Sequence, residues 1–256
     1  MANDGKITRH IPDAVKAELR REVGFGCPVE NCGTPFLEYH HFDPEFSVAP
    51  HHRPEGMIAL CPTHHRRAAE FSKSQLLSMK QNPWAKEIGE KFLWLREEVV
   101  AIVGGSYYHE TPNMVVFRGE PIVWYRRNEK NEMMFSFNML TSSGEPRAYM
   151  RDNDWTILGN PSDVICGPVA TRLEVEYPNG DGLYLRFREW ASAEKLEKKH
   201  PRMAELRSSV TYPLSTVEVT LAVGGQKFLG PNSTQLGGVT ITGMVSSRCG
   251  SGIVFG

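Results

Sequence analysis

The stretch from residue 27 to residue 65 concentrates the side chains that bind metals. It holds three of the five cysteines and six of the nine histidines, the histidines as adjacent pairs at 40–41, 51–52 and 64–65. Imidazole and thiolate are the usual ligands of zinc. The same stretch is rich in proline and poor in apolar residues, so it lacks the material for a core of its own. We therefore expect a bound metal to hold it folded.

The spacing of these residues predicts a structural zinc site. Cys27 and Cys32 form one ligand pair, and Cys61 and His64 form a second pair about thirty residues later. Each short pair lets one turn supply two ligands, and two such turns complete a tetrahedron. The alternative is that the cysteines are small buried apolar residues and that His64 begins a helix.

Local patterns around the zinc ligands predict a small α+β domain over residues 1–82. Apolar residues recur every four positions over 11–23, which predicts a helix that ends at Gly24. Short strands are expected at 35–39 and 57–60, and a helix at 64–80. Over 84–103, Trp84, Phe92, Leu95 and other apolar residues keep helical spacing. We expect a bridging helix over 83–105, packed on its own domain or against a second subunit.

After Gly105 the sequence changes to short apolar runs separated by Gly, Asn, Asp and Pro. This pattern predicts an all-β domain over 106–256, either a sandwich or a short solenoid. Its expected strands are 114–117, 122–125, 133–137, 183–187, 217–223, 239–241 and 253–255, with one helix within 190–207 and a hairpin turn at 179–182. Cys166, Cys249, Trp155 and Trp190 are expected to be buried.

Residues 20–82 resemble an HNH endonuclease of the ββα-metal, treble-clef type. The resemblance rests on the two ligand pairs, the doublet His40-His41 at a strand end, and His65 directly after the last zinc ligand. It implies that His41 is the general base that activates water. It also implies that His40 and His65 bind a catalytic Mg²⁺ or Mn²⁺ ion. Phosphodiester hydrolysis needs such a base and such a cation.

One position departs from the pattern of this family. An asparagine usually stands five residues before the cysteine of the second ligand pair, which is Cys61 here. In this chain that residue is Gly56. Its role is then lost, taken by Glu55 or His52, or left to water. His51 and His52 are either further metal or phosphate contacts or ordinary loop residues. Arg53, Arg66 and Arg67 flank the expected site and are candidate contacts to DNA phosphates.

The sequence thus predicts a metal-dependent DNA endonuclease with a β domain that controls assembly, recognition or activation. The resemblance implies a restriction-like or anti-phage defence role. The alternative is a non-catalytic, zinc-stapled DNA-binding or assembly protein. A formal net charge of −1 argues against a basic nucleic-acid wrapper. No apolar run reaches the roughly 18 residues of a membrane span, so we expect no membrane partner. Five cysteines, an odd number, do not form a disulfide framework, which suggests a reducing cytoplasm. Cutting both DNA strands would require two sites, which suggests a homo-oligomer.

Overall fold

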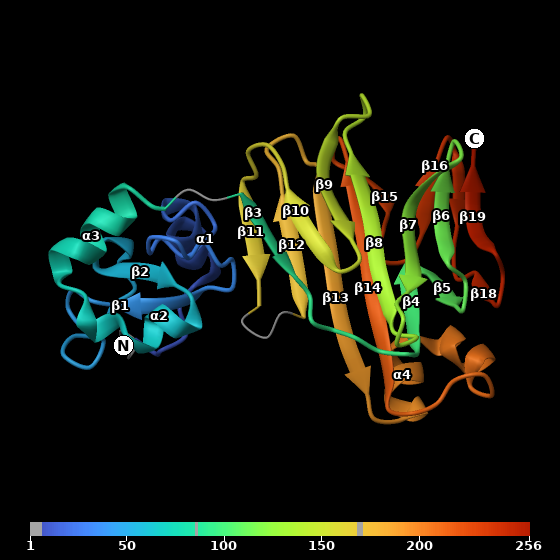
Figure 1. Ribbon diagram of the computed structural model, residues 1–256, viewed down its shortest axis with the longest axis horizontal. Helices are drawn as coiled ribbons and strands as arrows, with labels where there is room; N and C mark the ends of the chain where they lie inside the picture. The colour runs from blue at the N-terminus through green and yellow to red at the C-terminus, as the bar shows by residue number, and fades with distance from the viewer. Residues whose placement is uncertain (1–6, 85–86, 168–170) are drawn as a thin grey trace, which may run out of the picture. The chain divides into compact units, whose positions relative to one another are not determined.

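The computed structural model describes residues 7–84, 87–167 and 171–256 (Figure 1). The fold is mixed α+β, with many strands and few helices. The chain divides into two compact units. Unit 1 comprises Met1–Ile88 and Asp163–Val169, and unit 2 comprises Gly89–Ser162 and Ala170–Gly256.

Unit 1 is built from short elements around a two-stranded sheet. In chain order they are α1 (Asp13–Glu22), β1 (Glu38–His41), η1 (Pro54–Gly56), β2 (Met57–Leu60), α2 (Pro62–Arg66), η2 (Ala68–Glu70), α3 (Lys73–Gln81) and β11 (Asp163–Cys166). β1 and β2 pair antiparallel, with Tyr39 opposite Ala59. The expected helix at 11–23 and strand at 57–60 are confirmed, and the expected strand at 35–39 lies further along, at 38–41.

Leu19 of α1, all four residues of β2 and Leu76 of α3 belong to the small apolar core of unit 1. The helix expected over 64–80 is divided into α2, the turn η2 and α3. α3 begins at a capping box. The Ser72 side chain accepts a hydrogen bond from the backbone N–H of Gln75, and the Gln75 side chain accepts one from the backbone N–H of Ser72. This cap starts a new helix at residue 73.

A segment from the predicted β domain belongs to unit 1. Arg20 of α1 is buried, and its Nε and Nη2 donate to the carboxylate of Asp163 in β11 at 2.8 and 2.5 Å. Its Nη1 donates to the hydroxyl of Tyr39 at 2.7 Å. The guanidinium therefore ties α1, β1 and β11 together. Contact clustering groups β11 with unit 1, although the sequence placed all of 106–256 in one β domain.

Unit 2 consists of two β-sheets and a short helical segment. One sheet has the order β19-β6-β7-β8-β9-β10-β3, and in the other β12 to β17 pair in succession while β4 pairs in parallel with β14. The elements are β3 (Ile88–Lys91), β4 (Val99–Val103), β5 (Ser106–His109), β6 (Asn113–Phe117), β7 (Glu120–Arg127), β8 (Met133–Leu140), β9 (Pro146–Arg151), β10 (Asp154–Ile157), β12 (Arg172–Glu176), β13 (Gly182–Trp190), α4 (Ala193–Lys199), η3 (Pro201–Leu206), β14 (Leu214–Val223), β15 (Gln226–Leu229), β16 (Thr234–Leu236), β17 (Val239–Ile241), β18 (Val245–Ser247) and β19 (Ser251–Phe255).

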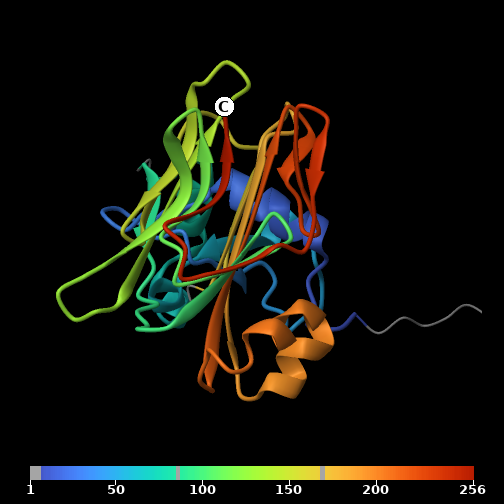
Figure 2. The same ribbon diagram turned by 90° about the vertical axis from the view of Figure 1, so that its right-hand side faces the viewer.

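The two sheets of unit 2 face each other as a sandwich (Figure 2). Phe135 of β8 and Phe187 of β13 come from opposite sheets, and their ring centroids lie 6.0 Å apart. Phe92 contacts both Phe187, at 5.4 Å, and Trp155, at 5.9 Å. All four side chains are buried. Of the two architectures left open by the sequence, the sandwich is therefore the one that forms.

The bridging helix expected over 83–105 is wrong. Residues 88–91 and 99–103 are strands β3 and β4, and residues 85–86 lie outside the described part of the chain. The run Val99–Val103 is largely β-branched and fully buried, which suits a central strand paired with β14. Phe92 lies in the sandwich core. The described residues of 83–105 therefore form no helix that could present Trp84, Phe92 and Leu95 together to a second subunit.

The finer expectations for the β domain are mostly confirmed. The expected helix is α4 followed by η3, and residues 177–181 form the predicted turn, closed by a hydrogen bond from the N–H of Tyr177 to the carbonyl of Asp181. Trp155, Trp190 and Cys166 are buried. Cys249 is exposed, contrary to the prediction, because it follows the end of β18 in a loop.

Candidate metal centre and histidine cluster

Cys27, Cys32, Cys61 and His64 come together as the sequence predicts. Their ligand atoms all lie within 4.8 Å of one another. His64 Nδ1 is 3.4 Å from Cys27 Sγ and 3.3 Å from Cys61 Sγ, and the sulfurs of Cys32 and Cys61 are 3.8 Å apart. Ligands at zinc's usual bond lengths form a tetrahedron with edges of about 3.5–3.8 Å. The cluster therefore fits a metal ion such as zinc.

Two tight turns bring these ligands into position. In the first, the Cys32 N–H donates to the Val29 carbonyl, and the Gly33 N–H donates back to the Cys27 carbonyl. Gly33 has φ = +63°, a conformation that glycine adopts without strain. In the second, β2 ends at Leu60 and Pro62 begins α2, so that Cys61 and His64 lie on one helical turn.

The two cysteines of the first turn differ in acidity. Burial raises the pKa of Cys27 to about 12. Burial also opposes ionisation of Cys32, but hydrogen bonds involving the backbone and side chain of Thr34 outweigh it and lower the pKa of that thiol. Metal ligation requires thiolates, so a cation at this cluster must release the Cys27 proton on binding.

On one side of β1, His40 lies beside His65. Their ring centroids are 5.5 Å apart. Glu38 precedes His40 by two residues, which places both on the same face of the strand. Glu38 Oε2 accepts a hydrogen bond from His65 Nδ1 at 2.7 Å. In a neutral ring, this contact places the lone pair on His65 Nε2, as in carboxylate–histidine pairs that bind metals. The two predicted ligands of a catalytic ion are thus neighbours.

His41 has different partners from His40. Its ring packs edge-on against Phe46 and His51, with centroids at 4.9 and 5.1 Å. Its Nε2 donates to the backbone carbonyl of His51 at 2.9 Å. Because a carbonyl only accepts, Nε2 carries the proton and Nδ1 of the neutral ring is the free base. Burial lowers the pKa of His41, so the ring is neutral near pH 7.

His51 fastens the loop that supplies this carbonyl. Its side chain is buried, with 6% exposed. Its Nε2 donates to the Pro44 carbonyl at 2.9 Å, and its Nδ1 accepts from the Arg53 N–H at 3.1 Å. Both ring nitrogens are therefore satisfied. Of the two readings left open by the sequence, His51 is a structural loop residue, though a buried one.

Gly56 is required where the sequence departs from the expected asparagine. A Cβ at this position would lie 2.0 Å from the Asp43 carbonyl oxygen and 2.9 Å from His51 Cε1. The Gly56 carbonyl in turn accepts hydrogen bonds from the N–H groups of Phe42 and Asp43. The two ends of the loop meet too closely for any side chain. The contact to the His41 ring comes instead from the His51 carbonyl.

Lys80 of α3 holds the second end of the same loop. Its side chain is 8% exposed, and its Nζ donates to the carbonyls of Pro54 and Met57 at 2.5 and 2.8 Å. Glu22 lies 3.0 Å from the same ammonium and balances its charge. Lys73 forms an ion pair with Asp43 at the first end. These contacts fix the position of the His51 carbonyl beside His41.

The three arginines expected to bind phosphate are all exposed. The guanidinium of Arg67 is paired with Glu70, with contacts of 3.0 and 2.6 Å. Within the described part of the chain, Arg53 and Arg66 have no ion pair. Arg53 and Arg66 are therefore the better candidates, and Arg67 is occupied.

Sequence reasoning missed Glu38 and Lys80, and it left the role of His51 open. Glu38 had a usable signal, since alternation along a strand places residues 38 and 40 on the same face. His51 and Lys80 had none, because their roles depend on how the loop over 43–56 closes. No known family model, curated protein or solved structure matches this chain. In the described residues, no helix is long and apolar enough to cross a membrane.

Proposed function

We propose that this chain is a metal-dependent HNH-type endonuclease, with residues 20–82 as a treble-clef ββα-metal domain that hydrolyses DNA phosphodiester bonds. One observation carries the proposal. The doublet on β1 presents His40 to His65 and Glu38, while His41 is held in a single tautomer by the His51 carbonyl. This arrangement stands directly beside the Cys₃His cluster, because His64 and His65 are consecutive.

In the proposed reaction, Nδ1 of His41 accepts a proton from the attacking water. Oxygen of that water bonds to phosphorus, one P–O ester bond breaks, and the leaving oxygen takes up a proton from solvent. The His51 carbonyl stabilises the imidazolium that His41 becomes. His40 and His65 would hold Mg²⁺ or Mn²⁺, which supplies charge stabilisation on the phosphate oxygens. Two imidazole ligands favour Mn²⁺ over Mg²⁺.

DNA is the proposed partner, and contact with its backbone falls to Arg53 and Arg66. A single site of this kind cuts one strand, so cleavage of both strands requires two chains. We therefore retain a homo-oligomer as part of the proposal. The bridging helix expected over 83–105 is not the contact that forms it. A cytoplasmic, restriction-like defence role is the setting in which such a nuclease would act.

A plasmid-nicking assay tests the proposal. Wild-type protein with Mn²⁺ or Mg²⁺ should convert supercoiled plasmid to the open circle, and chelator should stop the reaction. His41→Ala should lower the rate by about 10²–10⁴-fold, because it removes the general base. His10→Ala is the matched control, since His10 is an exposed histidine outside the cluster. Equal nicking by His41→Ala and wild type would overturn the assignment of the base.

Gly56 supports a second candidate, a zinc-stapled protein that binds DNA or assembles without cutting. A backbone contact at this position leaves no room for the asparagine that the resemblance implies. Stable DNA binding with no cleavage under either divalent ion would favour this alternative. The zinc site and the loop over 43–56 would then hold a DNA-binding or assembly surface in shape.

A further inference from the structure

Unit 2 contains a cavity between its two sheets that the proposed nuclease does not use. Its volume is about 500 Å³, within the range of about 300–1,000 Å³ typical of small-molecule sites. Phe117, Ile122 and Met139 line it from one sheet, and Leu221, Val223 and Phe228 from the other. Met139, Leu221 and Ile122 are almost fully buried, so the inner part of the cavity is apolar.

The mouth of this cavity is formed by hairpin turns. The β8–β9 turn at residues 141–144 and the turns near 118, 226 and 237 all contribute, and they lie at the end of the sandwich that is uppermost in Figure 2. The β8–β9 turn adds hydroxyl groups from Thr141, Ser142 and Ser143, and strands β15 and β16 add the amides of Gln226 and Gln235. The cavity is therefore amphipathic, apolar inside and polar at the rim.

The rim carries positive charge only. Arg118 and Lys227 line the cavity, and none of its described lining residues is acidic. In the part of the chain that the structure describes, neither cation has an ion-pair partner. The Arg118 guanidinium lies over the Phe117 ring, 5.1 Å from its centroid, which holds the charge at the mouth. Two unneutralised cations above an apolar pocket favour an anion with an apolar body.

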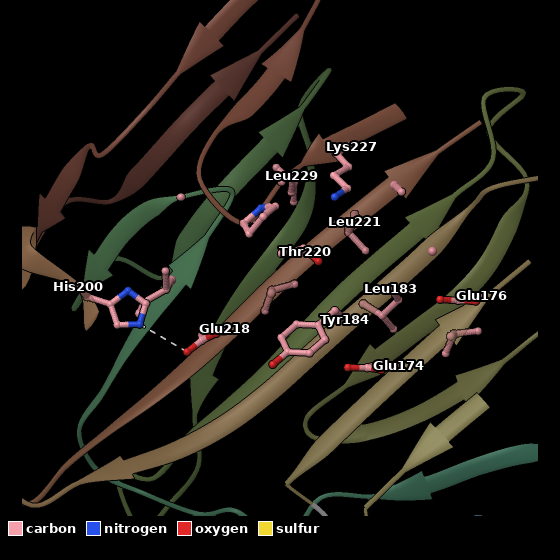
Figure 3. Close-up of a pocket in the computed structure, with 18 residues that line it drawn as sticks. Glu174, Glu176, Leu183, Tyr184, His200, Glu218, Thr220, Leu221, Lys227 and Leu229 are labelled. Carbon is pink, nitrogen blue, oxygen red and sulfur yellow. Dashed lines mark ion pairs between the residues drawn. The ribbon is translucent and has the colours of Figure 1, made fainter. Parts of the chain in front are cut away.

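A second cavity in the same unit shows the contrast. It has a volume of about 530 Å³ and lies on one face of the sheet formed by β12, β13 and β14 (Figure 3). Lys227 lines this cavity as well as the first one, and two of the cavity's three carboxylates have ion-pair partners within the chain. Glu174 pairs with Arg172, and Glu218 pairs with Lys199 and His200. Among the described residues, Glu176, Lys227 and Arg118 have no ion pair, and Arg118 is the cation that lines the first cavity alone.

We propose that the cavity between the sheets binds a small amphipathic organic anion, with its apolar body between Phe117, Met139 and Phe228 and its carboxylate or phosphate at Arg118 and Lys227. The acidic group would be neutralised by the two rim cations, and the turns would supply further hydrogen bonds. This site belongs to unit 2 alone and does not rest on the proposed nuclease. Ligand binding there would give the β unit a sensing role.

Calorimetric titration of the full chain tests this proposal. Octanoate supplies an acyl body with a carboxylate, and adenosine monophosphate supplies an aromatic body with a phosphate. Octan-1-ol and adenosine are their uncharged counterparts. At least one anion should bind with one-to-one stoichiometry and at least tenfold more tightly than its counterpart. The anion that binds identifies the kind of apolar body.

Variants show whether binding occurs at the rim cations. Arg118→Gln/Lys227→Gln should raise the dissociation constant at least tenfold, because hydrogen bonds to charged groups contribute that much. Lys130→Gln/Lys195→Gln removes two exposed cations elsewhere in the unit and should leave binding unchanged. No binding of either anion at millimolar concentration would overturn the proposal. Equal binding of the neutral counterparts, or unchanged binding by the rim variant, would overturn it as well.

Discussion

The two units of this chain are stabilised in different ways. Unit 1 has a small apolar core and depends on a few polar contacts, namely the Cys₃His cluster, the Arg20–Asp163 pair, and the bonds that His51 and Lys80 make to the loop at 43–56. Unit 2 has two paired sheets and an interior of large aromatic side chains. Stability is concentrated at a few atoms in unit 1 and spread over many contacts in unit 2.

This difference has consequences for function. A site that needs fixed donors and acceptors benefits from a loop whose carbonyls are held by named side chains, as the His51 carbonyl is beside His41. A sandwich with diverging ends instead leaves an apolar cavity between its sheets. Chemistry is therefore expected in unit 1 and ligand binding in unit 2.

Removing the metal should have the largest effect. Structural zinc contributes apparent binding energies of about 10–16 kcal/mol in small domains at pH 7, and unit 1 has little core to compensate. Cys61→Ser, or strong chelation, should abolish zinc binding and unfold unit 1 while unit 2 stays folded. Elemental analysis measures the zinc, and hydrogen exchange resolved by peptide measures each unit.

Cys249→Ser is the matched control, because Cys249 is exposed and lies outside the cluster. It should retain one zinc per chain. Folded wild-type protein with no bound metal would refute the metal assignment. Loss of protection in both units would show that they fold as one.

Truncation of the sandwich core should have the next largest effect. Phe187 contacts Phe92, Trp94 and Phe135 and is 2% exposed. Phe187→Ala should destabilise unit 2 by about 3–5 kcal/mol, because it leaves a cavity in a packed interior. Four of the five tryptophans belong to unit 2, so their fluorescence reports its unfolding.

Zinc content and the exchange protection of unit 1 should not change in Phe187→Ala. Leu93→Ala serves as the control in the same unit, since Leu93 is 79% exposed. If Leu93→Ala were equally destabilising, stability would not reside in the aromatic interior.

Short-range features of both units were predictable from the sequence. The zinc ligands are paired within turns, and β2, α1 and the 179–182 turn depend on neighbouring residues. The assignment of 99–103 failed because a short apolar run has no period that separates a helix from a buried strand. Here the decision came from β14, which is distant in sequence.

Long-range contacts could not be predicted. Asp163 returns to Arg20 across most of the chain, and nothing near either residue indicates the pairing. The role of His51 depends on the close approach of Asp43 and Gly56, a property of the folded loop. In the candidate site, the sequence thus identified the Cys₃His cluster but not the contacts that Glu38, His51 and Lys80 make around it.

Adding a side chain at residue 56 should have a smaller effect, confined to the loop. Gly56→Ala should cost about 1–3 kcal/mol, because its Cβ meets backbone that must shift. Gly56→Asn introduces the residue usual in the family that residues 20–82 resemble, yet it should lower the proposed plasmid nicking rather than raise it. Thermal unfolding and exchange over 43–56 measure the effect.

Gly167→Ala is the matched control, since a Cβ there meets no atom within 4 Å. It belongs to the same unit and should be neutral. A Gly56→Asn protein that is as stable as wild type and cuts faster would show that the loop opens easily and that His51 does not fasten it.

Acidification should have the smallest effect, and it should act on unit 2. Burial opposes ionisation of Glu218, but hydrogen bonds from His200 and Lys199 outweigh it and lower its pKa to about 2. An unfolded glutamate has a pKa of about 4.3. The folded state therefore gains stability above about pH 4.3 and loses it as the pH falls toward 2, because the unfolded chain binds the proton first. For a pair near the surface we expect about 1 kcal/mol.

Glu218→Gln should remove this part of the pH dependence of unit 2 unfolding, measured by tryptophan fluorescence in urea between pH 5 and pH 3. Glu194→Gln, a change at an exposed residue in α4, should retain it. Parallel profiles for wild type and Glu218→Gln over this range would show that Lys199 and His200 do not stabilise the carboxylate. In that case the stability of unit 2 would come from its packed interior and not from this ion pair.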